Sequence, residues 1–210
     1  VLQRQKLYQA ALKLARQSKR KAMLSSRYAT ALQCLDYERR SLREMAPSDL
    51  DESLLMLRQE EERILVNLAD LQTLMHGYDL LRAKSKHGFA PRSLGEMEEV
   101  RQIADDPIVE RLRETGNYVE VALCINILGI RDLFERNALP ALFRYQGFLK
   151  NWSAKLEWQI DQGSLLYHIS TMYLIACSTS PSTWDEVKDY LAFVPDSKVF
   201  AEEDARTFQN

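Results

Sequence analysis

The stretch REMAPSDLDE, Arg43 to Glu52, separates two long segments that carry few helix-breaking residues. Residues 2–46 contain neither glycine nor proline, and after the turn the next cluster of breaking residues is SKHGFAPRS, far along the chain. Pro47 ends the first segment because proline lacks the backbone N–H of a helix interior and disfavours helical conformation in the residue before it. Ser48 with Asp51 provides a plausible cap for the following helix.

Both segments carry a heptad pattern. In the first segment, one set of residues recurs every seven positions and includes one lysine: Leu7, Leu14, Lys21, Tyr28, Leu35 and Leu42. In the second segment, residues follow one another at intervals that alternate between four and three positions: Leu50, Leu54, Leu57, Glu61, Ile64, Leu68, Leu71, Met75 and Tyr78. Such spacing is typical of helices that pack side by side along their length. The long stem of the lysine can pack there while its ammonium group reaches water.

The sequence therefore predicts an all-α fold, in which a long antiparallel coiled-coil helical hairpin is followed by a helical bundle. The hairpin is expected over residues 1–87, with its turn near residues 46–48. A helix of about 40 residues would extend roughly 60 Å. An alternative is a break in the first arm, near Ser18 or Ser25-Ser26, which would give shorter helices in a compact bundle.

The second half has shorter segments and more aromatic residues. Ser93 with Glu96 fits a capping box, and Asp106-Pro107 fits a helix start with proline in the first position. We expect a helical bundle over residues 93–195, followed by a polar C-terminal tail over residues 196–210.

Four further segments complete the predicted bundle. One of them, residues 138–162, fits a helix that is kinked or entered at Pro140. Tyr118–Ile130 is ambiguous, because its β-branched residues suit a strand as well as a buried helix; the helix is favoured since no second clear strand could pair with it. Leu165–Cys177 is apolar nearly all round and fits a central helix. A capping box formed by Thr183 and Glu186 opens a last helix, which closes at Pro195.

Positive charge is concentrated at the start of the chain. The first 43 residues hold eleven Lys and Arg against Asp36 and Glu38, a net charge of +9, whereas residues 106–210 have a net charge of −5. In a hairpin, Glu60 to Glu62 come near the arginines beside the turn, and Glu61 is expected to pair with one of them. The residues opposite 6–27 offer few acids, so this end of the hairpin is expected to be uncompensated.

The candidate binding residues come from this uncompensated end. Lys6, Lys13, Arg20 and Arg27 recur every seven residues, which places them on one side of a helix. Together with Lys19 and Lys21 they are the predicted partner-binding residues, and this set of six is called the basic stripe. A solvated helix face, or packing against the acidic second half, would explain the same residues without any partner.

A short part of this region resembles a known family. The segment LYQAALKLARQ, Leu7 to Gln17, and the later Ala22, Tyr28, Leu32 and Leu35 resemble the short helical hairpins of the lethal-giant-discs family of endosomal regulators. The resemblance implies a basic hairpin that holds subunits of membrane-remodelling filaments. Lys19-Arg20 replaces the Gly-Asp turn of those hairpins, and nothing after Met45 follows the family. The chain is therefore not assigned to it.

No catalytic, cofactor-binding or metal-binding constellation is evident in the sequence. His76 with Asp70 and Asp79 fits solvated helix residues better than a metal site, and His168 fits a hydrogen-bonded core histidine better than a catalytic one. The aromatic group Tyr145, Phe148, Trp152 and Trp158 fits a core better than a partner-binding patch. The sequence therefore predicts no enzyme, no cofactor and no metal; an all-α active site around His168 is a minor alternative.

The predicted function is a non-enzymatic protein–protein interaction, as a scaffold or adaptor subunit of an intracellular complex. The basic stripe would contact an acidic partner surface. The scattered cysteines Cys34, Cys124 and Cys177 favour reduced thiols, and we expect a cytoplasmic rather than a nuclear location. The alternative is sequence-nonspecific binding of nucleic acid or of an anionic membrane, of the endosomal-remodelling type, through the same residues. The hairpin could also pair with a second copy of the chain.

Overall fold

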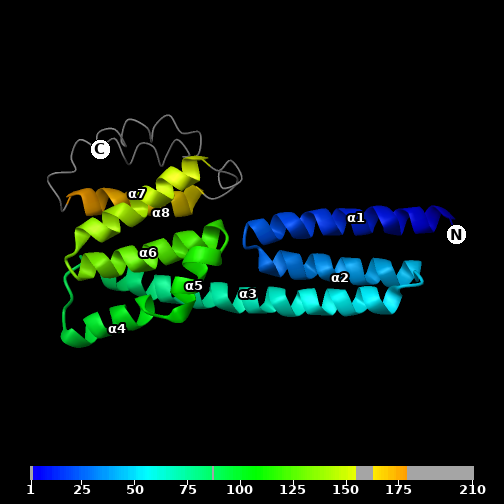
Figure 1. Ribbon diagram of the computed structural model, residues 1–210, viewed down its shortest axis with the longest axis horizontal. Helices are drawn as coiled ribbons and strands as arrows, with labels where there is room; N and C mark the ends of the chain where they lie inside the picture. Colours follow the sequence, from blue (N-terminus) through cyan, green and yellow to red (C-terminus); the bar gives the residue numbers. More distant parts are fainter. Residues whose placement is uncertain (1, 87, 155–162, 179–210) are drawn as a thin grey trace. The chain divides into compact units, whose positions relative to one another are not determined.

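A computed structural model describes residues 2–86, 88–154 and 163–178, and every regular element among them is an α-helix (Figure 1). The all-α class is confirmed, as is a helical hairpin followed by a helical bundle. The described helices are α1 (Leu2–Leu24), α2 (Tyr28–Met45), α3 (Leu50–Ser85), α4 (Leu94–Ala104), α5 (Pro107–Thr115), α6 (Tyr118–Phe134), α7 (Ala138–Ala154) and α8 (Gly163–Ser178). The last helix and the tail predicted beyond residue 178 lie outside the described residues.

The chain divides into two compact units, Val1–Thr73 and Leu74–Asn210. The boundary lies inside α3, so this single helix contributes residues to both units. The boundary expected from the sequence, between residues 87 and 93, corresponds to the connection between α3 and α4.

The turn between α2 and α3 lies where Pro47 predicts it. α2 ends at Met45, and Ala46 adopts a left-handed conformation with φ 42° while its N–H donates to the carbonyl of Leu42. Because Pro47 follows directly, the helix cannot continue, and α3 begins at Leu50.

The α3 side of the hairpin follows its predicted heptad pattern within the first unit. Leu57, Ile64 and Leu71 are buried at seven-residue spacing. Between the two helices, Arg39 Nη2 lies 2.6 Å from Glu61 Oε2, which confirms the expected pairing of Glu61 with an arginine of the first arm.

The first arm of the hairpin is not the single helix expected over residues 2–46. α1 ends at Leu24, and Ser26 adopts φ 54°. The N–H groups of Ser26 and Arg27 donate to the carbonyls of Met23 and Ala22, at 3.3 and 2.8 Å, which is the pattern of a Schellman motif. This motif usually has glycine in the left-handed position, so the serine here gave no strong signal of a helix end. The alternative break at Ser25-Ser26 is the one found.

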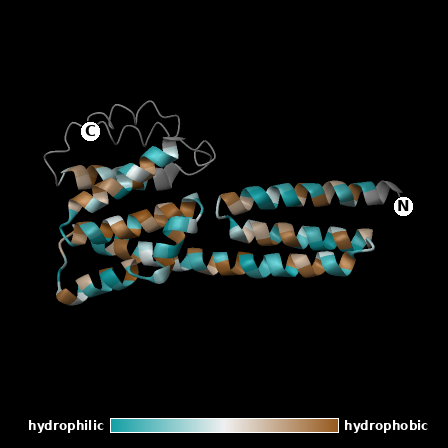
Figure 2. Cartoon of the chain, in the orientation of Figure 1, coloured by the Kyte–Doolittle hydropathy of each residue, from teal (hydrophilic) through white to brown (hydrophobic). Residues whose placement is uncertain are grey.

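Because of this reversal, α1 folds back antiparallel along α2, and α2 lies between α1 and α3 (Figure 1). α1 buries Leu12, Ala15, Lys19 and Ala22. The heptad pattern predicted for the first arm is therefore wrong in α1, where Leu7 and Leu14 are 67% and 64% exposed, and correct in α2, where Tyr28, Leu35 and Leu42 are buried. Hydrophilic and hydrophobic residues alternate in short patches along all three helices, as expected of amphipathic helices (Figure 2).

In the second unit, α6 resolves the ambiguity of Tyr118–Ile130 in favour of a buried helix. Its start is a capping box: Asn117 Oδ1 accepts from the N–H groups of Val119 and Glu120, and Glu120 Oε2 accepts from the Asn117 N–H. α6 packs against α4, α5, α7 and α8. The helix starts predicted at Ser93 and at Asp106-Pro107 are confirmed, since each side chain caps its helix.

Glu96, in the first turn of α4, provides a pH-dependent contribution to stability. Its buried carboxylate accepts hydrogen bonds from the Arg92 side chain and from the Arg92 N–H at 2.6 Å, and these bonds lower its pKa from 4.5 to about 2. The unfolded chain binds a proton here near pH 4.5, so the contribution is complete above that pH and is lost as the pH falls toward 2. Glu96→Gln is expected to be less stable than the parent at neutral pH, with a difference that shrinks in that window.

Urea unfolding of both proteins across this pH range measures the difference. Glu98→Gln, an exposed position of the same helix, serves as the matched control and should follow the parent closely. A difference between Glu96→Gln and the parent that persists unchanged at pH 2 would contradict the prediction.

Candidate binding groove

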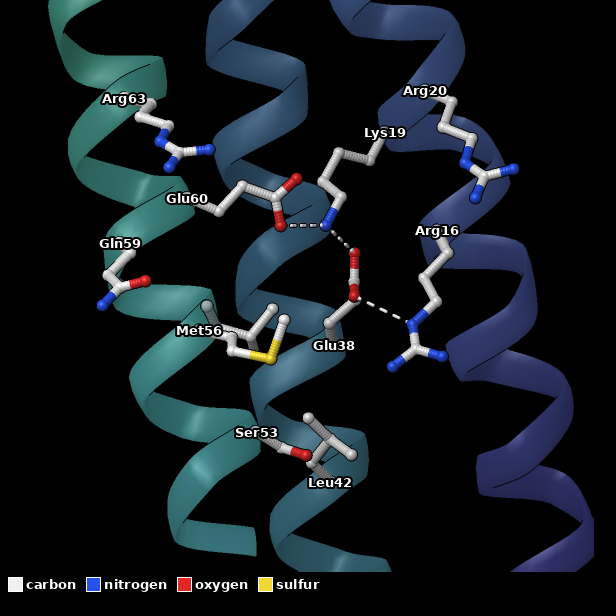
Figure 3. A pocket seen from close by; sticks show the side chains of 11 residues that line it. Arg16, Lys19, Arg20, Glu38, Leu42, Ser53, Met56, Gln59, Glu60 and Arg63 are labelled. Carbon is white, nitrogen blue, oxygen red and sulfur yellow. Dashed lines mark hydrogen bonds and ion pairs between the residues drawn. The ribbon is translucent and has the colours of Figure 1, made fainter. Parts of the chain in front are cut away.

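Lys19 lies at the centre of an ion-pair network that joins the three helices of the first unit. Its ammonium nitrogen is 2.7 Å from Glu38 Oε1 on α2 and 2.6 Å from Glu60 Oε2 on α3 (Figure 3). Arg16, one turn earlier on α1, places Nε 3.3 Å from Glu38 Oε2. A single lysine of α1 thus connects both other helices.

The carboxylate of Glu38 is the most deeply buried charge of this network, with only 1% of the residue exposed. The contact between Lys19 and Glu38 Oε1 meets the distance of an ion pair but not the geometry of a hydrogen bond, and Oε1 has no hydrogen-bond partner among the described residues. Glu60, in contrast, accepts a hydrogen bond from Lys19. Because a buried carboxylate is stable only beside a counter-charge, Glu38 depends on Lys19 and Arg16.

A groove of about 560 Å³ opens over this network (Figure 3). α1 provides one wall, α3 provides the other, and α2 provides the floor with Glu38 and Leu42. The residues that the walls contribute are Arg16, Lys19, Arg20, Ser53, Met56, Leu57, Gln59, Glu60 and Arg63. All of them belong to the first unit.

The groove carries an excess of positive charge. Its four cations, Arg16, Lys19, Arg20 and Arg63, face two carboxylates, those of Glu38 and Glu60. Arg20 and Arg63 are exposed, and within the described part of the chain neither has an ion-pair or hydrogen-bond partner. Two guanidinium groups on opposite walls are therefore available to an anionic ligand.

The six residues of the basic stripe are not equivalent in the structure. Lys6, Lys13, Arg20, Lys21 and Arg27 are exposed, and Arg20 lines the groove. Lys19 is only 7% exposed and paired twice, so the expectation that this end of the hairpin is uncompensated is wrong for this residue. The reason is the reversal at Ser26, which brings α1 alongside Glu38 of α2.

Sequence reasoning missed Arg16 and Arg63 as members of the groove. Arg16 precedes Arg20 by four residues, a spacing that places both on one side of a helix. Nothing comparable marks Arg63, because its place on the opposite wall depends on how α1 and α3 flank α2.

The other residues considered from the sequence differ in their burial. His168 on α8 is half-buried, and burial, with a smaller contribution from the charge of Arg82, lowers its pKa. His76 on α3 is exposed. Tyr145, Phe148 and Trp152 are buried in the core of the second unit, as expected, whereas Trp158 lies outside the described residues.

The described residues contain no group of three or more His, Cys, Asp or Glu that could hold a metal ion. Cys34, Cys124 and Cys177 are buried and form no disulfide with one another, and burial raises the pKa of the Cys124 thiol to about 12. Over the same part of the chain, no helix combines the length and the apolar character needed to cross a lipid bilayer.

Comparison with models of protein families, with curated proteins and with solved structures finds no match for this chain. The functional argument therefore depends on the residues of the groove.

Proposed function

We propose that the protein is a non-enzymatic interaction subunit, a scaffold or adaptor, that contacts an acidic partner protein through the groove of its first unit. The observation that carries this proposal is the pair Arg20 and Arg63, exposed on opposite walls and without a partner among the described residues. Unpaired guanidinium groups favour the approach of carboxylates, with which arginine can form two parallel hydrogen bonds.

Two features of the groove favour a protein partner over a nucleic acid. Met56, which is 65% exposed, and the buried Leu42 and Leu57 supply apolar surface, which a phosphate backbone does not use. The carboxylates of Glu38 and Glu60 lie between the cations and would repel a continuous row of phosphates.

The test is affinity capture from cell lysate with three forms of the complete chain: the parent, Arg20→Glu/Arg63→Glu, and Lys6→Glu/Lys21→Glu. Both variants change the charge by the same amount, but only the first changes the groove. The proposal thus narrows the contact surface from the predicted basic stripe to the groove, which Arg20 lines and which Lys6 and Lys21 do not. Each capture is made at low and at high salt, with and without nuclease, and the bound proteins are identified by mass spectrometry.

We expect proteins that bind the parent and the Lys6/Lys21 variant at both salt concentrations and are lost from the Arg20/Arg63 variant. Capture at low salt only, abolished by nuclease or consisting of lipid, would instead support the alternative of nucleic-acid or anionic-membrane binding. Identical sets of proteins on all three forms would mean that the groove is a solvated surface.

A further inference from the structure

We infer that the occupant of the groove is a short amphipathic α-helix of the partner, with an apolar side chain at one end of the groove and carboxylates at the other. This inference rests on the proposed function and specifies the chemistry of the partner segment.

The form of the occupant follows from the backbone of the groove. All three of its sides are helix interiors, Arg16–Arg20 of α1, Glu38–Leu42 of α2 and Ser53–Arg63 of α3. Their N–H and C=O groups are engaged within their own helices, so the groove offers side chains and no free backbone groups. An extended peptide would leave its backbone unsatisfied there, whereas a helix satisfies its own.

The chemistry of the occupant follows from the distribution of residues along the groove. One end holds the apolar side chains of Leu42 and Met56, and Figure 3 shows Met56 directed into the groove. The other end holds Arg20 and Arg63, on opposite walls. A carboxylate that enters between these two arginines makes charge-assisted hydrogen bonds with either wall.

The spacing of these two ends predicts the spacing of the partner's side chains. Met56 and Arg63 are seven residues apart on α3, or about 10 Å at 1.5 Å per residue. A helix that lies along the groove therefore needs an apolar residue and an acidic residue about two turns apart. It covers Ser53 to Arg63, about 15 Å, with three turns.

The experiment uses the complete chain as bait for a phage-displayed library of 14-residue peptides with a helical alanine-rich framework and randomised positions on one face. We expect enrichment of Asp or Glu about seven residues from Leu, Met or Phe. Enriched peptides are then synthesised with a fluorophore, and their affinity is measured by fluorescence anisotropy. Replacement of their acidic residues by the isosteric amides should weaken binding at least about tenfold.

Two variants of the bait separate the groove from general charge. Arg20→Gln/Arg63→Gln should lose the enriched peptides, whereas Lys6→Gln/Lys21→Gln, which removes the same charge elsewhere on α1, should retain them. Met56→Ser should weaken binding without changing the charge. Because all five side chains are exposed, each variant should keep the far-UV circular dichroism of the parent.

Three outcomes would overturn the inference: no enrichment, enrichment of peptides without acids, or acidic peptides that bind the Arg20/Arg63 variant equally well. None of these contradicts the proposed function if lysate capture still depends on Arg20 and Arg63, since the partner would then present another kind of acidic surface. Capture that is independent of both arginines would contradict the proposed function itself.

Discussion

Gly129→Ala is expected to destabilise the second unit by about 3 kcal/mol, because the new methyl group has no room. A Cβ at Gly129 would overlap Oη and Cζ of Tyr145 and lie 2.7 Å from its Cε2. Tyr145 cannot move aside easily, since it is fully buried within the core of the second unit. Either the tyrosine leaves its position or α6 and α7 separate, and each response exposes part of the core.

Urea unfolding followed by tryptophan fluorescence measures this effect, since Trp152 is buried in the core of the second unit and the sequence of the first unit contains no tryptophan. Gly147→Ala is the matched control: a Cβ at that exposed position of α7 meets no atom within 4 Å. There the same substitution should stabilise the protein by about 0.5–1 kcal/mol, the usual gain of alanine over glycine within a helix.

A double-mutant cycle identifies Tyr145 as the cause. Tyr145→Leu alone should be destabilising, but Gly129→Ala should cost much less in its presence, so that the two effects are not additive. Additive effects of the two substitutions, or a Gly129→Ala variant as stable as the parent, would contradict the overlap seen in the structure.

Lys19→Met is expected to destabilise the first unit by about 3 kcal/mol, the lower range for removing one partner of a buried ion pair. The substitution keeps most of the apolar stem but removes the ammonium group that lies beside Glu38 and Glu60. Glu38 then remains buried with only the more distant contact to Arg16 at 3.3 Å. Circular dichroism during urea unfolding measures the change, and tryptophan fluorescence provides the comparison, because the first unit consists of helices and its sequence contains no tryptophan.

Two comparisons make this result specific to the network. Lys21→Met removes the same charge from an exposed position of α1 and should change stability by no more than about 0.5 kcal/mol. Adding Glu38→Gln to Lys19→Met should recover part of the loss, because the buried carboxylate is then neutral. Equal effects of the Lys19 and Lys21 substitutions would show that the network contributes nothing beyond surface charge.

The parts of the fold that were predictable are those encoded locally. Pro47 marks the α2–α3 turn, and the heptad spacing of α3 identifies its buried face as far as Leu71. The capping box of Asn117 and Glu120 was also available in the sequence and would have identified α6 as a helix from its first turn.

The break at Ser26 was only an alternative, because the left-handed position of a Schellman motif is usually glycine. Its position also decides which side of α1 is buried, since a helix that folds back faces a different neighbour. Lys19 therefore could not be distinguished from Lys21 by sequence: the choice depends on Glu38, which lies on the next helix. The sequence likewise could not show that Arg20 and Arg63 lie on opposite walls of one groove.

The continuity of α3 has a consequence for dissecting the protein into pieces. A chain that ended at Thr73 would cut α3 at the boundary of the two units. The first piece would then have four carbonyl groups without helical partners, and the second piece would have four such N–H groups. A second piece that began after Ser85 would instead lack Leu74, Tyr78 and Leu81, which are buried. Truncation and fusion to other domains should therefore keep α3 whole, because this one helix contributes residues to both units.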